Sequence, residues 1–117
     1  MEELELKGVI QTYLEGATYA DADKLRRALH EDFRTAGHFN GQLSWSNRND
    51  AIAACEKGGI DRATPLPPWR ILEQSVNGDT AMAIVESEWS GMSFLETLTL
   101  ILKDGRWQIV FKAFYIK

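Results

Sequence analysis

The sequence is poor in cysteine, in basic residues and in long apolar runs, and each shortage excludes a class of protein. Cys55 is the single cysteine, so an internal disulfide is excluded and a reducing compartment is favoured. The longest apolar stretches, such as residues 81–85, fall far short of the roughly 20 residues that span a membrane. The 13 basic residues are outnumbered by 17 acidic ones, which disfavours nucleic-acid or anionic membrane partners. The start of the chain is acidic, unlike a secretory signal, so we expect a cytoplasmic protein.

Motifs for nucleotide, metal and nucleophile chemistry are also missing. The glycines match neither a phosphate-binding loop nor a dinucleotide fingerprint, and no serine sits in a Gly-x-Ser-x-Gly elbow. Two histidines and one cysteine are too few for a tetrahedral zinc site at ordinary spacing. We therefore expect no metal and no cofactor, and we interpret Cys55 as a small apolar filler of a helix.

Three helices are predicted in the first half of the chain. Apolar residues recur at three- and four-residue spacing over residues 4–19, which is typical of a helix. A second helix is predicted to begin after the N-cap Asp21 and to end near His30. A third is predicted to open at residue 46 or 47 and to end at the glycines 58–59.

Strands dominate the remainder, with a proline-containing loop at residues 60–68 before most of them. The predicted strands span residues 33–39, 42–45, 69–76, 80–89, 94–103 and 106–116. Asn40-Gly41 is a strong hairpin signal, and short turns join the last four strands into an antiparallel meander. The sequence thus predicts one α+β domain over residues 1–117, with the helices on one face of an antiparallel sheet.

Both faces of the predicted sheet are apolar. In the last strand the alternation puts two sets on opposite faces: Trp107, Ile109, Phe111, Ala113 and Tyr115, against Gln108, Val110, Lys112, Phe114 and Ile116. A sheet with one solvated face would alternate cleanly between apolar and polar residues. Since three helices can cover only one face, we expect a homodimer through the outer face, with Glu86, Glu88 and Lys112 on that side.

The order of elements resembles the nuclear transport factor 2-like superfamily. The segments that carry the resemblance are residues 10–16 (IQTYLEG), 23–33 (DKLRRALHEDF), 70–72 (RIL), 76–81 (VNGDTA) and 102–110 (LKDGRWQIV). The subgroup that it most resembles is that of the bacterial "putative lumazine-binding" and polyketide-cyclase-like proteins. The resemblance implies a strongly curved sheet that forms a cone with an internal pocket, and homodimers through the outer sheet face. It does not imply one activity, because such relatives include isomerases, dehydratases, cyclases and non-catalytic binders.

Three residues are candidates for acid–base catalysis in such a pocket. Tyr13 resembles the tyrosine of the family's isomerases; its alternative role is that of a core tyrosine. Glu96 shares its face with apolar residues, where burial suits a proton-transferring carboxylate; alternatively it lies near the strand end in water. His38 has a side chain suited to a general base; alternatively it is a rim histidine. The catalytic aspartate of the isomerases has no counterpart in the strand after Asp32, which weakens an isomerase mechanism.

The leading hypothesis is a dimeric domain that binds a small apolar or aromatic ligand. Its expected lining comprises Tyr13, Trp89, Glu96, Phe111 and Tyr115, with His38 and Trp45 at the mouth. If the protein is an enzyme, we expect cofactor-free proton transfer, with Glu96 or His38 as the base and Tyr13 or Tyr115 as the donor. The alternative is a non-catalytic structural or association domain whose cone is filled by side chains. A third hypothesis, a partner-binding module, needs an exposed apolar patch beyond the dimer face.

Overall fold

The computed structural model describes residues 2–117, with side chains from residue 4 onward. The chain starts with two helices, α1 (Glu2–Tyr19) and α2 (Ala22–Ala28). Asp21 caps α2 as predicted, since its carboxylate accepts a hydrogen bond of 3.2 Å from the backbone N–H of the third residue along. The second helix ends at Ala28, two residues before the predicted end near His30, because the chain becomes extended at Leu29 and pairs there with the sheet.

Six strands form one sheet in the order β2-β1-β6-β5-β4-β3. Their bounds are β1 (Leu29–Phe39), β2 (Gln42–Asn47), β3 (Arg70–Asn77), β4 (Thr80–Trp89), β5 (Met92–Lys103) and β6 (Arg106–Ile116). The predicted meander is present as β3 to β6, and the predicted first hairpin as β1 and β2. All neighbours pair antiparallel except β1 and β6, which are parallel.

The hairpin turns follow from local residue chemistry. Asn40-Gly41, Ser90-Gly91 and Asp104-Gly105 all have positive φ angles, from 51° to 80°. A two-residue turn with both φ angles positive matches the twist of the strands that it joins, and glycine and asparagine tolerate it best. These turns are therefore determined by the sequence within a few residues.

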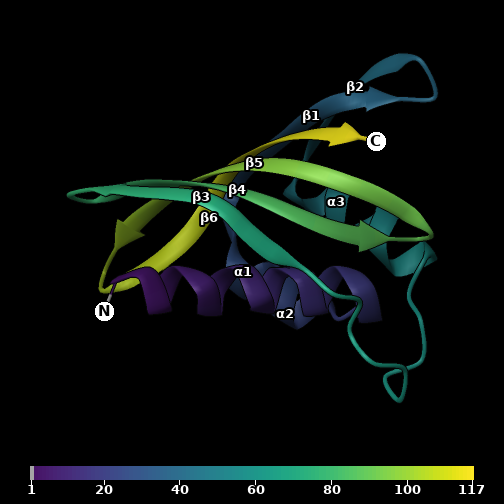
Figure 1. Cartoon of the computed structure of the whole chain (residues 1–117), viewed down its shortest axis with the longest axis horizontal. Helices are drawn as coiled ribbons and strands as arrows, with labels where there is room; N and C mark the ends of the chain where they lie inside the picture. Colours follow the sequence, from purple (N-terminus) through teal and green to yellow (C-terminus); the bar gives the residue numbers. More distant parts are fainter. Residues whose placement is uncertain (1) are drawn as a thin grey trace.

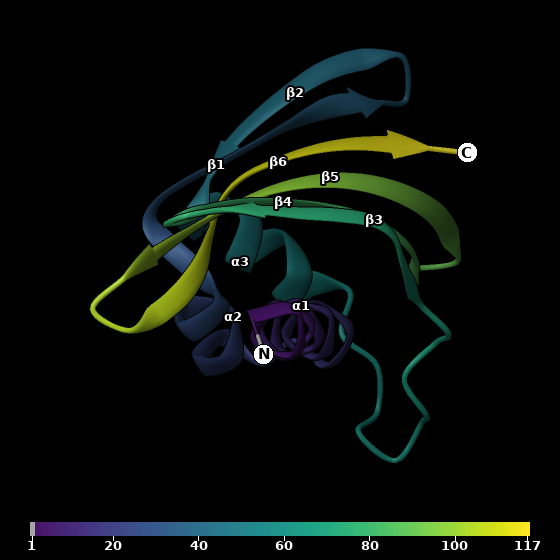
Figure 2. The same ribbon diagram turned by 60° about the vertical axis from the view of Figure 1, so that its left-hand side comes forward.

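The sheet curves over the helices, as Figures 1 and 2 show. The third helix, α3 (Arg48–Lys57), packs against α1, α2 and the β1–β2 hairpin. The most deeply buried side chains come from both layers: Leu6, Ile10, Leu25, Leu29, Phe33, Val85, Leu98, Leu100 and Ile109. The core thus lies between the helices and the inner face of the sheet, which matches the predicted α+β class.

A β-bulge interrupts β6. Ile109 pairs with Leu100 of β5, whereas Phe111 pairs with the adjacent Thr99, so Val110 is an extra residue in the ladder. Because side chains alternate with a period of two, one extra residue exchanges the two faces of the strand beyond it.

The bulge corrects the faces predicted for the second half of β6. Lys112 and Phe114 turn toward the helices, where both line a cavity described below. Phe111 and Tyr115 turn to the outer face, and Tyr115 is 64% exposed. The prediction that Lys112 lies on the outer face is therefore wrong, as is the inner placement of Phe111 and Tyr115.

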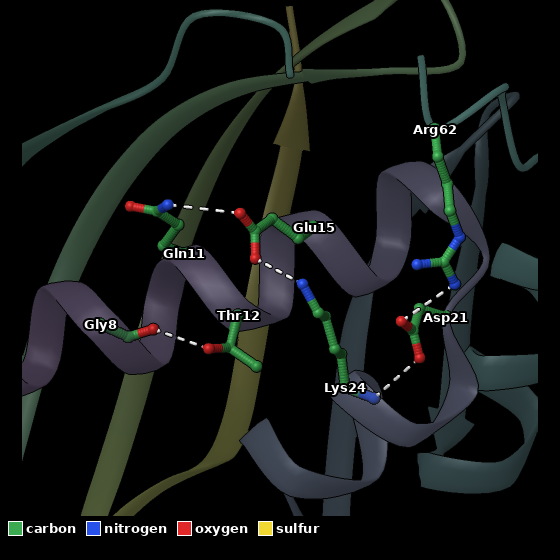
Figure 3. A network of polar contacts seen from close by, with 7 residues as sticks. All are labelled: Gly8, Gln11, Thr12, Glu15, Asp21, Lys24 and Arg62. Atoms are coloured by element: carbon green, nitrogen blue, oxygen red, sulfur yellow. Dashed lines mark hydrogen bonds and ion pairs between the residues drawn. The ribbon is translucent and has the colours of Figure 1, made fainter. Parts of the chain in front are cut away.

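A polar network on the surface joins α1, α2 and the loop after α3 (Figure 3). Lys24 forms an ion pair of 2.9 Å with Glu15, and Arg62 of the loop forms one of 3.1 Å with Asp21. The hydrogen bond from Lys24 is the main reason that the pKa of Glu15 is lowered. The pKa of Asp21 is lowered chiefly by the backbone N–H of Lys24 and then by Arg62. The network thus fixes the α1–α2 turn and the base of the loop.

Within the described residues, none of the helices has the length and apolar character needed to cross a membrane.

Candidate functional site

A cavity of about 650 Å³ lies between the helices and the inner face of the sheet. Its apolar walls include Leu14 of α1, Leu25 of α2 and Phe33 of β1. Because organic ligands generally occupy pockets of about 300–1,000 Å³ with mainly apolar walls, this cavity has the size of a small-molecule site.

One wall of the cavity is a continuous row of aromatic rings. The centroids of Trp89 and Phe94 lie 6.2 Å apart, and those of Phe94 and Phe114 lie 6.0 Å apart. The indole N–H of Trp89 donates a hydrogen bond of 3.0 Å to the carbonyl of Ala17, which ties the end of β4 to α1. The row therefore offers a rigid surface for a flat ring.

Three polar side chains meet at the cavity: Tyr13 of α1, Glu96 of β5 and Lys112 of β6. The Tyr13 hydroxyl lies 3.2 and 3.0 Å from the two carboxylate oxygens of Glu96. The Lys112 ammonium donates to the Tyr13 oxygen at 2.7 Å and forms an ion pair with Glu96 Oε2 at 3.3 Å. The side chains of Glu96 and Lys112 are 5% and 16% exposed, so most of this ion pair is shielded from water.

The direction of the protons in this cluster follows from its charges. Burial, and then the negative charge of Glu96, raise the pKa of Tyr13 well above its usual value, so the hydroxyl keeps its proton. An ammonium has only donors and a carboxylate only acceptors. Lys112 therefore donates to Tyr13, and Tyr13 donates to Glu96.

Cys55 of α3 also lines the cavity. Burial is the main cause of its raised pKa; the charge of Lys112 opposes this effect and that of Glu96 adds to it. Since the thiolate is the nucleophilic form, Cys55 is a poorly reactive thiol in this setting.

Four of the predicted site residues, Tyr13, Trp45, Trp89 and Glu96, border the cavity. The indole ring of Trp45 nevertheless packs against Phe111, at 6.3 Å between centroids, and the residue is 65% exposed. Trp45 thus borders the cavity at the edge of the sheet and presents its ring to the outer side.

The other three predicted residues, His38, Phe111 and Tyr115, are not among those that line the cavity. Phe111 and Tyr115 are directed outward because of the bulge in β6. His38 is exposed on β1 and pairs with Leu43 of the hairpin, while its neighbour Phe39 lines the cavity. The hydrogen bonds and the ion pair of the polar cluster do not include His38.

The sequence interpretation missed Lys112 and Thr35 as cavity residues. They are partners in the parallel ladder between β6 and β1, and both line the cavity. No local signal marks the bulge at Val110, since it contains no glycine. Phe114 lies two residues after Lys112 and therefore shares its face of the strand. Its large apolar side chain was the one available hint that this face is internal.

The described residues contain one grouping with the composition of a metal site, His30, Glu31 and Asp32 at the start of β1. His30 Nδ1 already accepts a hydrogen bond of 3.0 Å from the backbone N–H of Asp32, and both acids are exposed. None of the three lines the cavity. We therefore interpret these three residues as an ordinary polar cluster on the protein surface.

The fold is that of the nuclear transport factor 2-like superfamily. A structure of an NTF2-like protein of unknown function from Silicibacter pomeroyi DSS-3 is 37% identical, with a TM-score of 0.94 over 99% of this chain and 96% of its own. One from Shewanella baltica OS155, also of unknown function, is 20% identical, with a TM-score of 0.86 over 99% and 94%. One from Methylobacillus flagellatus KT is 23% identical, with a TM-score of 0.83 over 99% and 92%.

The family can be stated more narrowly. The family model described as "Putative lumazine-binding" matches residues 2–115, so the chain belongs to this family. No curated protein matches the chain significantly. A de novo designed protein with a curved β-sheet also has this fold, at a TM-score of 0.64 and 16% identity. The same fold can host different functions, so the fold by itself does not specify an activity.

Proposed function

We propose that this protein binds a small, largely apolar and flat organic molecule in the cavity between its helices and sheet. The observation that carries the proposal is a cavity of about 650 Å³ that combines an aromatic wall with the buried Tyr13–Glu96–Lys112 cluster. The family name suggests a heteroaromatic ligand of the lumazine type, which has the flat shape that this wall suits.

The rival hypothesis of a purely structural domain requires an interior filled by side chains. An internal volume above about 300 Å³ supports ligand binding instead, because filled cores contain few voids larger than a water molecule. A carboxylate and an ammonium buried in one cluster are also an unfavourable choice for mere packing, since apolar residues of similar size are often at least as stable.

A pair of phenylalanine substitutions on α3 tests ligand binding. Cys55→Phe places a ring in the cavity, whereas Ala53→Phe places one on the exposed face of the same helix. Titration of lumazine and a set of other bicyclic heteroaromatics, followed by amide chemical shifts, should show binding by the wild type and Ala53→Phe but not by Cys55→Phe. If no compound shifts the amides of the cavity strands, or Cys55→Phe binds as the wild type does, the proposal is wrong.

Cofactor-free acid–base catalysis of the isomerase, dehydratase or cyclase type is the second candidate function. It is favoured by one feature, a carboxylate that borders the cavity and is in contact with two proton donors. In this scheme Glu96 accepts a proton from the bound molecule, while Tyr13 or Lys112 donates to the oxygen where charge develops. Once a substrate is known, Glu96→Gln should lower kcat by at least about a hundredfold with little change in KM. Unchanged kcat would remove Glu96 from the reaction.

We also propose that the protein is a homodimer through the outer face of its sheet. Large apolar side chains remain on this face: Trp45, Ile84, Leu95, Ile101, Phe111 and Tyr115. Their number supports a covering partner, because monomeric proteins seldom expose large contiguous apolar patches. Light scattering should give twice the 13.2 kDa mass of the chain, and a value of one chain at micromolar concentration would contradict the proposal.

A further inference from the structure

A buried glycine lies behind the aromatic wall of the cavity. Gly37 of β1 pairs with Phe114 of β6, at the last pair of the parallel ladder between these strands. Its φ angle is not positive, so the backbone conformation does not require a glycine here. The reason for a glycine at this position is therefore the space around it.

The side chain of Phe114 occupies that space. A β-carbon on Gly37 would lie 2.6 and 2.7 Å from the two δ carbons of the Phe114 ring, and 2.6 Å from the Phe114 carbonyl oxygen. Non-bonded carbon atoms are normally about 3.5–4.0 Å apart, so no side chain on residue 37 is compatible with this position of the ring. The Phe114 ring thus leans over β1 and fills the volume that a side chain of β1 would otherwise take.

The same ring also borders the cavity. Phe114 lines the cavity, the centroid of its ring is 6.0 Å from that of Phe94, and the Lys112 ammonium lies 5.5 Å from the Phe114 centroid. The ring therefore joins the aromatic row to the polar cluster. A side chain on residue 37 would push it about 1 Å away from β1, and the space on that side is the cavity.

The volume of the cavity indicates a ligand larger than two fused rings. At about 650 Å³ it lies in the range of pockets that hold drug-sized molecules. A flat ligand needs about 3.5–4.0 Å between each of its faces and the wall. A wall that moves inward by about 1 Å therefore excludes a ring from this part of the cavity.

We propose that Gly37 sets the size of the ligand: because it has no side chain, the Phe114 ring lies back against β1 and leaves room for a third fused ring beside the polar cluster. This assignment rests on the proposed ligand-binding function and adds the size class of the preferred ligand. Gly37 is a positioning residue, since it acts through Phe114 and not by touching the ligand.

The test compares two probes that differ by one ring: quinoline, with two fused rings, and acridine, with three. Dissociation constants are measured by amide chemical-shift titration. The wild type should bind acridine at least about tenfold more tightly, because the third ring buries more apolar surface. Gly37→Ala should lose at least about fivefold of this preference, while its affinity for quinoline changes by less than about threefold, because the smaller probe still fits against Trp89 and Phe94.

Two further variants separate the ring from other effects of the substitution. The new β-carbon also meets the Phe114 carbonyl oxygen, so Gly37→Ala perturbs the strand pairing as well. Gly37→Ala/Phe114→Leu keeps this backbone contact but lacks the displaced ring, and should bind acridine at least about threefold more tightly than Gly37→Ala does. Gly8→Ala is the matched control, since a β-carbon on Gly8 of α1 would meet no atom within 4 Å, and it should leave both affinities unchanged.

A second measurement does not depend on the folding of any variant. In the wild type saturated with acridine, nuclear Overhauser effects should connect the probe with the ring protons of Phe114. If these effects are absent, the assignment is overturned, even where Gly37→Ala fails to fold.

The outcomes distinguish the two proposals. If the wild type does not prefer acridine, if Gly37→Ala keeps the preference or weakens both probes equally, or if the double variant recovers nothing, the role of Gly37 is wrong while ligand binding stands. If the wild type binds neither probe up to its solubility limit, both the size class and an apolar binding site of this kind are refuted.

Discussion

Removing one member of the buried ion pair should destabilise the protein far more than removing both. The variants Glu96→Gln and Lys112→Met each leave an uncompensated charge in a setting where the two side chains are 5% and 16% exposed. Such an isolated buried charge costs about 3–5 kcal/mol, a large part of the 5–15 kcal/mol that stabilises a typical domain. In the double variant no charge remains buried, and the amide oxygen of the introduced glutamine can still accept from Tyr13. We therefore expect the double variant to lose only about 1–2 kcal/mol.

Urea unfolding followed by the fluorescence of the four tryptophans measures these free energies. The four proteins form a double-mutant cycle, and the coupling free energy between Glu96 and Lys112 should exceed about 2 kcal/mol. Lys117→Met is the matched control, because Lys117 pairs with Glu86 at an exposed position and its loss should have a much smaller effect. Single variants that lose less than about 1 kcal/mol, or losses that simply add, would refute the description of a closed, water-excluding cluster.

Three further predictions concern the buried tyrosine, the helix cap and the outer face. Because the pKa of Tyr13 is raised in the folded state, its contribution to stability should be lost as the pH rises above about 10, and in Tyr13→Phe the alkaline loss of unfolding free energy should be smaller. A Tyr13→Phe profile parallel to that of the wild type would contradict this. Asp21→Ala should lose about 1 kcal/mol by urea unfolding with the loss of the α2 cap, whereas Asp21→Asn, which keeps the capping oxygen, should lose little; equal losses would refute the capping role. Tyr115→Arg should give a chain of monomer mass in light scattering while its circular dichroism stays unchanged, and a persistent dimer would place the interface elsewhere.

Local chemistry explains how much of the fold was predictable. The Asn-Gly, Ser-Gly and Asp-Gly turns require positive φ angles that few other residue pairs tolerate, so the hairpins follow from neighbouring residues alone. The cap of α2 by Asp21 is local in the same sense. Glu96 could be singled out because it is a polar residue on an otherwise apolar face, and Tyr13 because its place on the first helix resembles that of the tyrosine of the family's isomerases.

The wrong predictions for the faces of β6 and for the start of β1 have a common cause. The register of a strand depends on the strands with which it pairs and not on its own residues alone. Nothing near Val110 indicates an extra residue; the bulge is evident only from the pairing of β6, which lies between β5 and β1. The same pairing begins β1 at Leu29 and ends α2 early.

The sequence by itself therefore determined the class of fold and its turns and caps, because these depend on residues close together in the chain. It offered Tyr13 and Glu96 as candidates but did not bring them together, since they are 83 residues apart. Only the tertiary structure decided which face Lys112 occupies. The shift of one residue at Val110 carries Lys112 from the outer face to Tyr13 and Glu96, and sends Phe111 and Tyr115 the opposite way. Because side chains alternate between the two faces of a strand, a shift of one residue exchanges the faces of all residues beyond it. The lining of the cavity and its charged residues could therefore be identified only from the pairing of the strands.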